Sequence, residues 1–283
     1  MVRLISLDLD GTLLDSQRKI PDRNRIALQR ATEAGIEVII STGSPYGLMP
    51  HEDLKGIDIS YAITANGSAV YEYKTGKCIY ERSIATEEII PILEFLLSKD
   101  MHMDMFMGGK AYCPANTRQT VEKLAVPQSR KDYILKNHRM WLEDVIPYIR
   151  EHQLTMQKIT MNFYPGQDGE MVDREEVRQY LDKREDLKLV SGGWQNLEIT
   201  RADANKGDAL RWLCEHIGIA VEDTVAIGDS LNDLDIIQAA GVGVAMKNAM
   251  PVLLEAADVV TGSNDECGVA EYIEGVLKNA GLD

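Results

Sequence analysis

Short apolar runs alternate with amphipathic segments in the first and last thirds of the chain. In the first third, the apolar runs end at Leu7, Ile40 and Thr64, and the segment from Pro21 to Gly35 carries alanines at helical spacing. In the last third, a helical segment precedes the apolar run Thr224–Gly228, and further short runs follow it. Runs of this length predict buried strands, and the spacing between them predicts helices. The alternation predicts an α/β core with a doubly wound parallel sheet, formed by two separated pieces of the chain.

The middle of the chain has a different pattern, rich in methionine and tyrosine, in which helical and strand-like segments do not alternate regularly. We therefore predict an inserted α+β cap domain at residues 84–191, with residues 1–83 and 192–283 forming the core. Gly192–Gly193 is a plausible hinge on the return to the core.

Four methionines alternate with other residues near the start of this middle region, at positions 101, 103, 105 and 107. Alternation places all four thioethers on one face of a strand. A soft-metal site for Cu(I) is one reading of this face. We favour a core face of the cap sheet, because methionine fills irregular cores.

Composition narrows the functional classes. The 283 residues include 30 basic and 45 acidic ones, a net charge of −15, which argues against nucleic acid or an anionic membrane as partner. The chain has no apolar run of the ~18 residues that a membrane span needs and no signal-peptide pattern at its start, so we expect a soluble, cytoplasmic protein. The four cysteines lack the paired spacing of zinc sites or disulfide frameworks and are interpreted as ordinary thiols.

Two acids, Asp8 and Asp10, follow the first apolar run directly. They therefore lie where the strand opens into a loop, at the carboxyl edge at which α/β sheets bind ligands. Asp10-Gly11 is also a hairpin signal, but no alternating second strand follows. An EF-hand loop would need a glycine and a glutamate where Leu13 and Lys19 stand. Taken alone, this segment leaves the catalytic and structural readings open.

Three further polar segments are predicted at ends of core strands or helices. Ser41–Gly43 offers a hydroxyl and a glycine that permits close approach, although a helix N-cap would have the same composition. Lys206 begins a predicted helix, where an anion can bind, but a solvated lysine is equally common there. Gly228–Asp233 ends a strand, and its Ser230 and Asp233 form a near capping box. Capping does not account for Asp229.

In combination and order, these motifs resemble the haloacid dehalogenase superfamily of phosphatases. The matching segments are DLDGT at 8–12, STG at 41–43, the Lys-Gly pair at 206 and GDSLND at 228–233. Residues 245–249 and 265–269 are similar to the Cof-like branch, whose α/β cap is inserted after the third strand. The resemblance implies a Rossmann-like core and a phosphatase that acts on small phosphorylated metabolites, such as sugar phosphates or pyridoxal phosphate.

The resemblance also implies a role for each matching residue. Asp8 would attack phosphorus to form an aspartyl-phosphate, and Asp10 would serve as general acid and base. Mg²⁺ would be held by the side chains of Asp8 and Asp229 and by the backbone carbonyl of Asp10. Asp233 would orient Lys206 or a metal-bound water. The phosphoryl oxygens would be bound by Leu9, Thr42, Gly43, Lys206 and Asn232.

One position departs from the branch, which often has arginine where this chain has Ser44. A substrate with a second anionic group near this loop is therefore in doubt. Asn66-Gly67, at the end of the third apolar run, could contact substrate, but we favour a simple turn. Two alternative functions remain open: a sugar phosphomutase on the same fold, and a non-catalytic phosphate-sensing protein.

Overall fold

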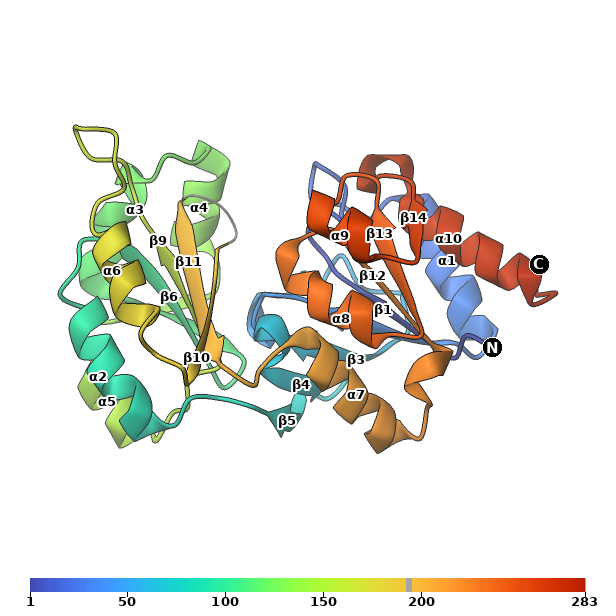
Figure 1. Ribbon diagram of the computed structural model, residues 1–283, viewed down its shortest axis with the longest axis horizontal. Helices are drawn as coiled ribbons and strands as arrows, with labels where there is room; N and C mark the ends of the chain where they lie inside the picture. Colours follow the sequence, from blue (N-terminus) through green and yellow to red (C-terminus); the bar gives the residue numbers. More distant parts are fainter. Residues whose placement is uncertain (192–194, 283) are drawn as a thin grey trace. The chain divides into compact units, whose positions relative to one another are not determined.

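Two separate β-sheets organise the chain in the computed structural model, which describes residues 1–191 and 195–282 (Figure 1). The core unit comprises Met1–Ser44, Met49–Tyr80 and the residues from Asn205 onward. The second unit comprises Pro45–Leu48 and Glu81–Ala204. The hinge predicted at Gly192–Gly193 lies outside the described residues.

The core unit contains an eight-stranded sheet in the order β14-β13-β12-β1-β2-β3-β4-β5. Neighbouring strands from β14 to β3 run parallel, and β4 pairs antiparallel with β3. Side chains of β1 are buried throughout, as expected for a central parallel strand covered on both faces. The strands are β1 (Leu4–Leu7), β2 (Glu37–Ser41), β3 (Ile59–Thr64), β4 (Ala69–Glu72), β5 (Lys77–Glu81), β12 (Thr224–Gly228), β13 (Val242–Met246) and β14 (Val259–Thr261).

Helices of the core unit pack in pairs, α1 with α10 and α7 with α8. Helix α7 buries Leu210 and Leu213 against Leu4 and Ile39 of the sheet. It ends at Gly218, whose φ of 69° places it in the left-handed conformation that favours glycine. The helices are α1 (Asp22–Glu33), α7 (Lys206–Ile217), α8 (Leu234–Ala239), α9 (Pro251–Ala256) and α10 (Gly268–Asn279), and the short helices used below are η2 (Ala65–Gly67) and η5 (Leu231–Asp233). The predicted doubly wound α/β core is confirmed.

The second unit contains a six-stranded sheet in the order β10-β11-β9-β6-β7-β8. Its pairs are antiparallel except for β7 with β8, which gives this unit the mixed α+β character predicted for the insertion. The strands are β6 (His102–Met107), β7 (Lys110–Pro114), β8 (Arg139–Leu142), β9 (Lys158–Asn162), β10 (Leu187–Val190) and β11 (Asn196–Arg201). The helices are α2 (Thr86–Leu96), α3 (Thr120–Lys123), α4 (Gln128–Lys136), α5 (Val145–Glu151) and α6 (Arg174–Leu181).

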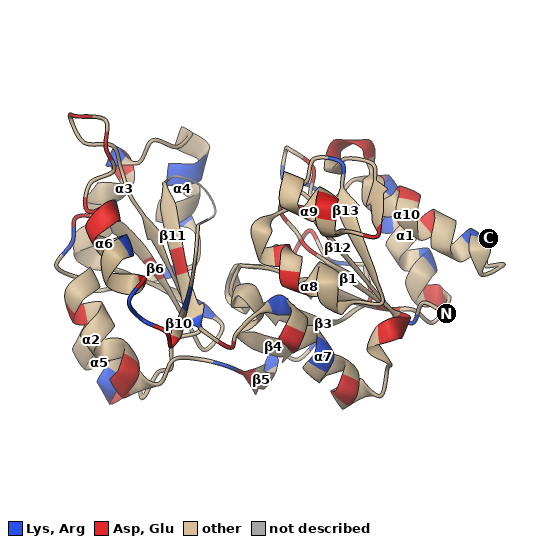
Figure 2. Ribbon diagram, viewed as in Figure 1, with Lys and Arg blue, Asp and Glu red and all other residues tan. Residues whose placement is uncertain are grey.

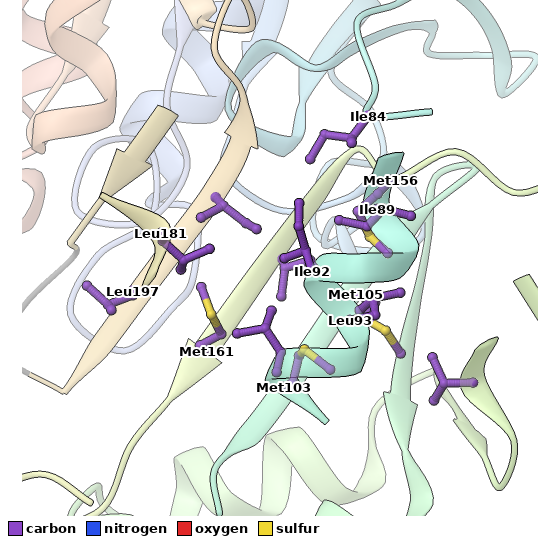
Figure 3. Close-up of a cluster of buried hydrophobic side chains, with 14 of the residues drawn as sticks. Ile84, Ile89, Ile92, Leu93, Met103, Met105, Met156, Met161, Leu181 and Leu197 are labelled. Carbon is purple, nitrogen blue, oxygen red and sulfur yellow. The ribbon is translucent and has the colours of Figure 1, made fainter. Parts of the chain in front are cut away.

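The four alternating methionines lie in the apolar core of the second unit. They pack with aliphatic side chains from α2 and α6, such as Ile92, Leu93 and Leu181, and Figure 3 shows Met103 and Met105 among them. This confirms the reading as a core face. The four thioethers therefore lie among apolar side chains of the core.

Basic side chains between residues 118 and 139 are largely engaged within the second unit. Lys123 pairs with Asp100 at 2.9 Å, Lys136 pairs with Asp132 at 2.7 Å, and the guanidinium of Arg118 lies over the ring of Trp141. Figure 2 shows basic positions on α4. These basic side chains therefore contact nearby acids and an aromatic ring.

Strand β11 differs from the sequence prediction, which assigned residues from 192 onward to the core. It pairs with β9 and β10, and so belongs to the sheet of the second unit. Its partly alternating burial differs from the continuous burial of the central core strands β1 and β12. Among the described residues, no helix has the length and apolar character needed to cross a membrane.

Candidate active site

The site begins with two carboxylates at the ends of neighbouring parallel strands. Asp8 follows β1 and Asp229 follows β12, and the register pairs Leu7 with Ile227. The backbone N–H of Asp8 donates to the carbonyl of Ile227 at 3.0 Å, which continues the pairing up to the acids. Parallel strands open their carboxyl ends at one edge of the sheet, so both carboxylates lie at that edge.

Lys206 lies between these acids as a fully buried ammonium. Its Nζ donates to Oδ1 of Asp8 at 2.8 Å, to Oδ1 of Asp233 at 2.5 Å and to the backbone carbonyl of Ser41 at 2.9 Å. These three bonds use every donor of the ammonium. Burial alone would lower the pKa of Lys206, but the charges of Asp233 and Asp8 raise it above its ordinary value. The lysine is therefore a fixed cation, and the reading as a solvated helix-start lysine is wrong.

Three carboxylates, those of Asp8, Asp229 and Asp233, offer oxygens that all lie within 4.8 Å of one another. With one ammonium among them, the group carries two negative charges in excess. Burial, together with the charges of Asp233 and Asp229, raises the pKa of Asp8 well above its usual value despite the attraction of Lys206. Burial and the charge of Asp233 raise the pKa of Asp229 to about 6. A divalent cation would relieve this excess, and carboxylate oxygens are the ligands that hard cations prefer.

Glycines allow the backbone to close around these acids. A Cβ at Gly11, where φ is +81°, would lie 2.5 Å from Oδ2 of Asp229. A Cβ at Gly228 would lie 2.5 Å from Cβ of Asp233. The hydroxyl of Thr12 donates to Oδ1 of Asp229 at 3.0 Å and orients that carboxylate. The carboxylate oxygens of this group suit a hard divalent cation.

The residues expected to bind phosphoryl oxygens come from the surrounding loops. Thr42 is buried after β2, and its hydroxyl accepts from the N–H of Ser44 at 3.1 Å. Gly43 lies between them, and Leu9 lies between the two N-terminal acids. Asn232 lies in η5, where its Oδ1 accepts from the hydroxyl of Ser230 at 2.6 Å.

The two carboxylate oxygens of Asp233 bind different partners. Its Oδ1 binds Lys206, while its Oδ2 accepts from the backbone N–H groups of Asp229 at 3.2 Å and Ser230 at 3.1 Å. The near capping box expected at Ser230 and Asp233 is present. The carboxylate of Asp233 therefore caps the short helix and also belongs to the charged cluster.

Asp10 lies apart from the carboxylate cluster. Its side chain is about half exposed, at 53%, and Oδ1 pairs with the guanidinium of Arg18 at 2.7 Å. The carboxylate of Asp10 is therefore accessible to solvent, whereas that of Asp8 is buried.

The sequence predicts no role for Thr12 or Arg18, and for Asn66 it leaves a substrate contact open while favouring a turn, although each of the three contacts a candidate residue. Thr12 lies within the DLDGT motif, and Asn66 was interpreted as part of a turn. Arg18 carried no sequence signal that would have revealed its contact. The structure places Asn66 in η2, and its Oδ1 accepts from Nδ2 of Asn232 at 3.0 Å.

Comparison with known proteins identifies the family. The family profile described as haloacid dehalogenase-like hydrolase matches residues 5–273. This chain belongs to the haloacid dehalogenase-like hydrolases. It is 33% identical to the phosphatase YwpJ of Bacillus subtilis, over 98% of this chain and 100% of the relative. It is 32% identical to the 5-amino-6-(5-phospho-D-ribitylamino)uracil phosphatase YcsE of the same organism, over 96% and 94%. The predicted superfamily, its Cof-like branch and the assignment as a phosphatase-type enzyme are confirmed.

Solved structures of this hydrolase family agree with the fold. A haloacid dehalogenase-like hydrolase from B. subtilis superposes with a TM-score of 0.82 at 30% identity, over 98% of this chain and 100% of the other. A second, from Bacteroides thetaiotaomicron, gives a TM-score of 0.78 at 28% identity, over 98% and 100%.

Proposed function

We propose that this hydrolase is a Mg²⁺-dependent phosphatase of small phosphorylated metabolites that works through an aspartyl-phosphate on Asp8. The observation that carries the proposal is the buried Lys206 ammonium, held between Asp8 and Asp233 and beside Asp229. Phosphoryl transfer requires mainly positioning and neutralisation of charge, and this group supplies a carboxylate nucleophile, a fixed cation and anionic oxygens that can bind a metal.

In the first step, an Oδ of Asp8 forms a bond to phosphorus as the ester P–O bond breaks. Asp10 gives its proton to the departing alkoxide. In the second step, Asp10 removes a proton from water, the water oxygen bonds to phosphorus, and Asp8 is released as a carboxylate. Asp8, Asp229 and the backbone carbonyl of Asp10 would hold Mg²⁺, which would offset the repulsion between the carboxylate and the phosphate dianion.

Binding of the phosphoryl oxygens falls to the surrounding donors. We assign this to the Thr42 hydroxyl, to the Asn232 amide and to the backbone N–H groups of Gly43 and Leu9. Lys206 contributes its positive charge beside the phosphoryl oxygens, because its three N–H groups are already bonded within the protein. Asp233 holds Lys206 in place through its short hydrogen bond. Substrate choice is assigned to the inserted domain predicted at 84–191.

Chelation of the purified full-length chain tests the metal requirement. Activity toward p-nitrophenyl phosphate should stop after treatment with EDTA and return with Mg²⁺, whereas the larger Ca²⁺ should inhibit. Asp229→Ala should raise the Mg²⁺ concentration needed for half-maximal rate, because it removes a ligand. Activity that survives exhaustive chelation would rule out this proposal.

A panel of phosphorylated metabolites should then identify the substrate. It would include sugar phosphates, pyridoxal phosphate and 5-amino-6-(5-phospho-D-ribitylamino)uracil, the compound named in the description of the relative YcsE. Phosphate released in equal amount to the alcohol indicates a phosphatase. Phosphate returned to another carbon of the sugar indicates a phosphomutase, and binding without turnover indicates a sensor.

A further inference from the structure

The short helix η2 after β3 contacts three of the segments assigned to phosphate binding, although the proposed mechanism gives it no role. Its central residue, Asn66, is 7% exposed and has a φ of 59°. Ala65 before it also has a positive φ of 50°. Residues other than glycine seldom adopt this backbone conformation, and they keep it only where surrounding contacts hold them in it.

The first contact orients Asn232. Its Nδ2 donates to Oδ1 of Asn66 at 3.0 Å, while its Oδ1 accepts from the hydroxyl of Ser230 at 2.6 Å. The amide is thus held at both ends. An NH₂ group has two hydrogens, so one N–H remains to donate to a phosphoryl oxygen.

The second contact is with the start of α7. A Cβ added at Gly67 would lie 2.1 Å from the carbonyl oxygen of Asn205 and 2.6 Å from the backbone nitrogen of Lys206. No side chain fits there, and the φ of +95° independently favours glycine. The backbone of η2 therefore packs directly on the segment that presents Lys206.

The third contact is with the loop after β2. The N–H of Ala65 donates to the carbonyl of Ser44 at 3.0 Å, and the N–H of Asn66 donates to the carbonyl of Thr42 at 3.3 Å. These bonds hold the peptide that carries the Thr42 hydroxyl and the Gly43 N–H.

We propose that Asn66 is a positioning residue for phosphoryl transfer, which acts by fixing the amide of Asn232 toward the phosphoryl group. The turn that contains Asn66 contacts all three segments that carry the residues assigned to phosphate binding. Its left-handed backbone allows one short turn to reach all three. This inference rests on the proposed function. It revises the interpretation of Asn66-Gly67 as a simple turn.

The deciding variant is Asn66→Gly, which removes the side-chain oxygen while tolerating the positive φ. We expect kcat/KM to fall roughly 10- to 100-fold, less than the ~10²- to 10³-fold typical of losing a donor outright, which is expected for Asn232→Ala. Gln153→Gly is the matched control, because Gln153 also has a positive φ, of 49°, but lies in the second unit. It should leave the kinetics unchanged.

A double-mutant cycle separates positioning from general loosening of the fold. If Asn66 acts through Asn232, Asn66→Gly should cost little more activity in an Asn232→Ala background. It should still lower the activity of Thr42→Ala by its full factor. Equal losses in both backgrounds, or an Asn66→Gly enzyme with wild-type kinetics, would overturn the inference.

Binding of inorganic phosphate in the presence of Mg²⁺, measured by calorimetry, tests the same point without turnover. The Kd should rise for Asn66→Gly and Asn232→Ala, and the double variant should match Asn232→Ala. A wild-type chain that binds phosphate but hydrolyses no ester would refute the proposed function while this cycle still decides the role of Asn66. A wild-type chain that binds no phosphate would overturn both.

Discussion

Each of the two units buries a cluster of three potential metal ligands, and the two clusters differ in charge balance. Among the described residues, one group is Asp8, Asp229 and Asp233 in the core unit, and the other is His102, Asp104 and Cys113 in the second unit. Each also contacts one basic side chain, Lys206 in the first group and Arg139 in the second. By geometry alone, both could hold a cation.

The core cluster has more negative than positive charge. Three carboxylates face one ammonium, and burial with mutual repulsion raises the pKa of both Asp8 and Asp229. Ionising all three acids without a further cation is therefore costly. This excess of negative charge is the property that a divalent cation can neutralise.

The cluster of the second unit is already compensated. The guanidinium of Arg139 donates to both carboxylate oxygens of Asp104, at 2.5 and 3.4 Å. Burial alone would raise the pKa of Asp104, but His102 and Arg139 hold it well below its usual range. Burial and the charge of Asp104 raise the pKa of the Cys113 thiol, so this sulfur is a poor metal ligand and nucleophile. The two clusters therefore differ in charge balance rather than in the density of ligand atoms.

The largest contrast should come from the same substitution in each cluster. Asp8→Asn should lower phosphatase activity by on the order of 10⁴-fold or more, because an amide neither attacks phosphorus nor binds the cation well. Asp104→Asn, the matched control, should keep kcat within about 3-fold at a temperature where it remains folded. Steady-state rates measure the effect of each substitution. Trapping of the aspartyl-phosphate on the wild-type chain identifies the residue that is phosphorylated. Substantial activity in Asp8→Asn, or a phosphorylated residue other than Asp8, would refute the assignment.

Asp10→Asn should have the next largest effect, a loss of ~10² to 10⁴-fold, as expected for a missing general acid–base. The loss should shrink for p-nitrophenyl phosphate, because p-nitrophenolate leaves without protonation. Comparing it with an alkyl phosphate over the same variants isolates the role of the acid. Equal losses for the two esters would assign Asp10 to another task, such as holding the metal. Arg18→Gln serves as a control, since it removes the partner of Asp10 but no proton donor.

Much of the core could be predicted from sequence because its strands are short, apolar and separated by helices with clear ends. The acids at strand ends could be located for the same reason, since a parallel sheet brings the carboxyl ends of its strands to one edge. Burial of Lys206 could not be predicted, because its partners Asp8 and Asp233 are 198 and 27 positions away. A lysine at the start of a helix has the same local pattern whether solvated or enclosed.

Other features depend on contacts that local patterns do not encode. The hydrogen bond of Asn66 with Asn232 spans 166 positions. The ion pair of Asp10 with Arg18 depends on side-chain conformations in a loop. The place of β11 depends on its pairing with β9. In each case the residue type suits several environments, and only the tertiary structure selects one.

Breaking the compensated pair of the second unit should affect stability rather than chemistry. Arg139→Met leaves the buried carboxylate of Asp104 without its cation, and we expect a loss of about 3–5 kcal/mol in the free energy of unfolding. Asp104→Leu combined with Arg139→Met should recover most of this loss, because neither charge remains buried. Urea unfolding monitored by circular dichroism measures it. The Mg²⁺ concentration for half-maximal activity should stay at the wild-type value below the unfolding transition. A shift in that requirement would indicate that the two clusters are functionally linked.

The smallest predicted effect concerns the stability of the metal-free protein. Asp229→Asn and Asp104→Asn should change its free energy of unfolding in opposite directions. The folded state raises the pKa of Asp229 from 3.8 to about 6. Between these values the folded state binds more protons than the unfolded one, so the contribution of Asp229 to stability falls as the pH rises and is fully unfavourable above pH 6. Asp229→Asn should therefore stabilise the metal-free protein at pH 7.5 by about 1–2 kcal/mol, after allowance for its partial exposure.

Asp104→Asn should do the opposite at the same pH, because the folded state lowers the pKa of Asp104 and its ionised form stabilises the fold. The advantage of Asp229→Asn should grow from pH 4 to pH 6 and then level off, because above pH 6 the wild-type Asp229 is ionised in both the folded and the unfolded states. The side-chain oxygen of the asparagine introduced at position 229 can still accept from the hydroxyl of Thr12, so the substitution leaves that hydrogen bond in place. Urea unfolding of EDTA-treated protein across this pH range gives both curves. Destabilisation by Asp229→Asn at pH 7.5 would mean that the core cluster is compensated without a metal, and the contrast between the two clusters would no longer hold.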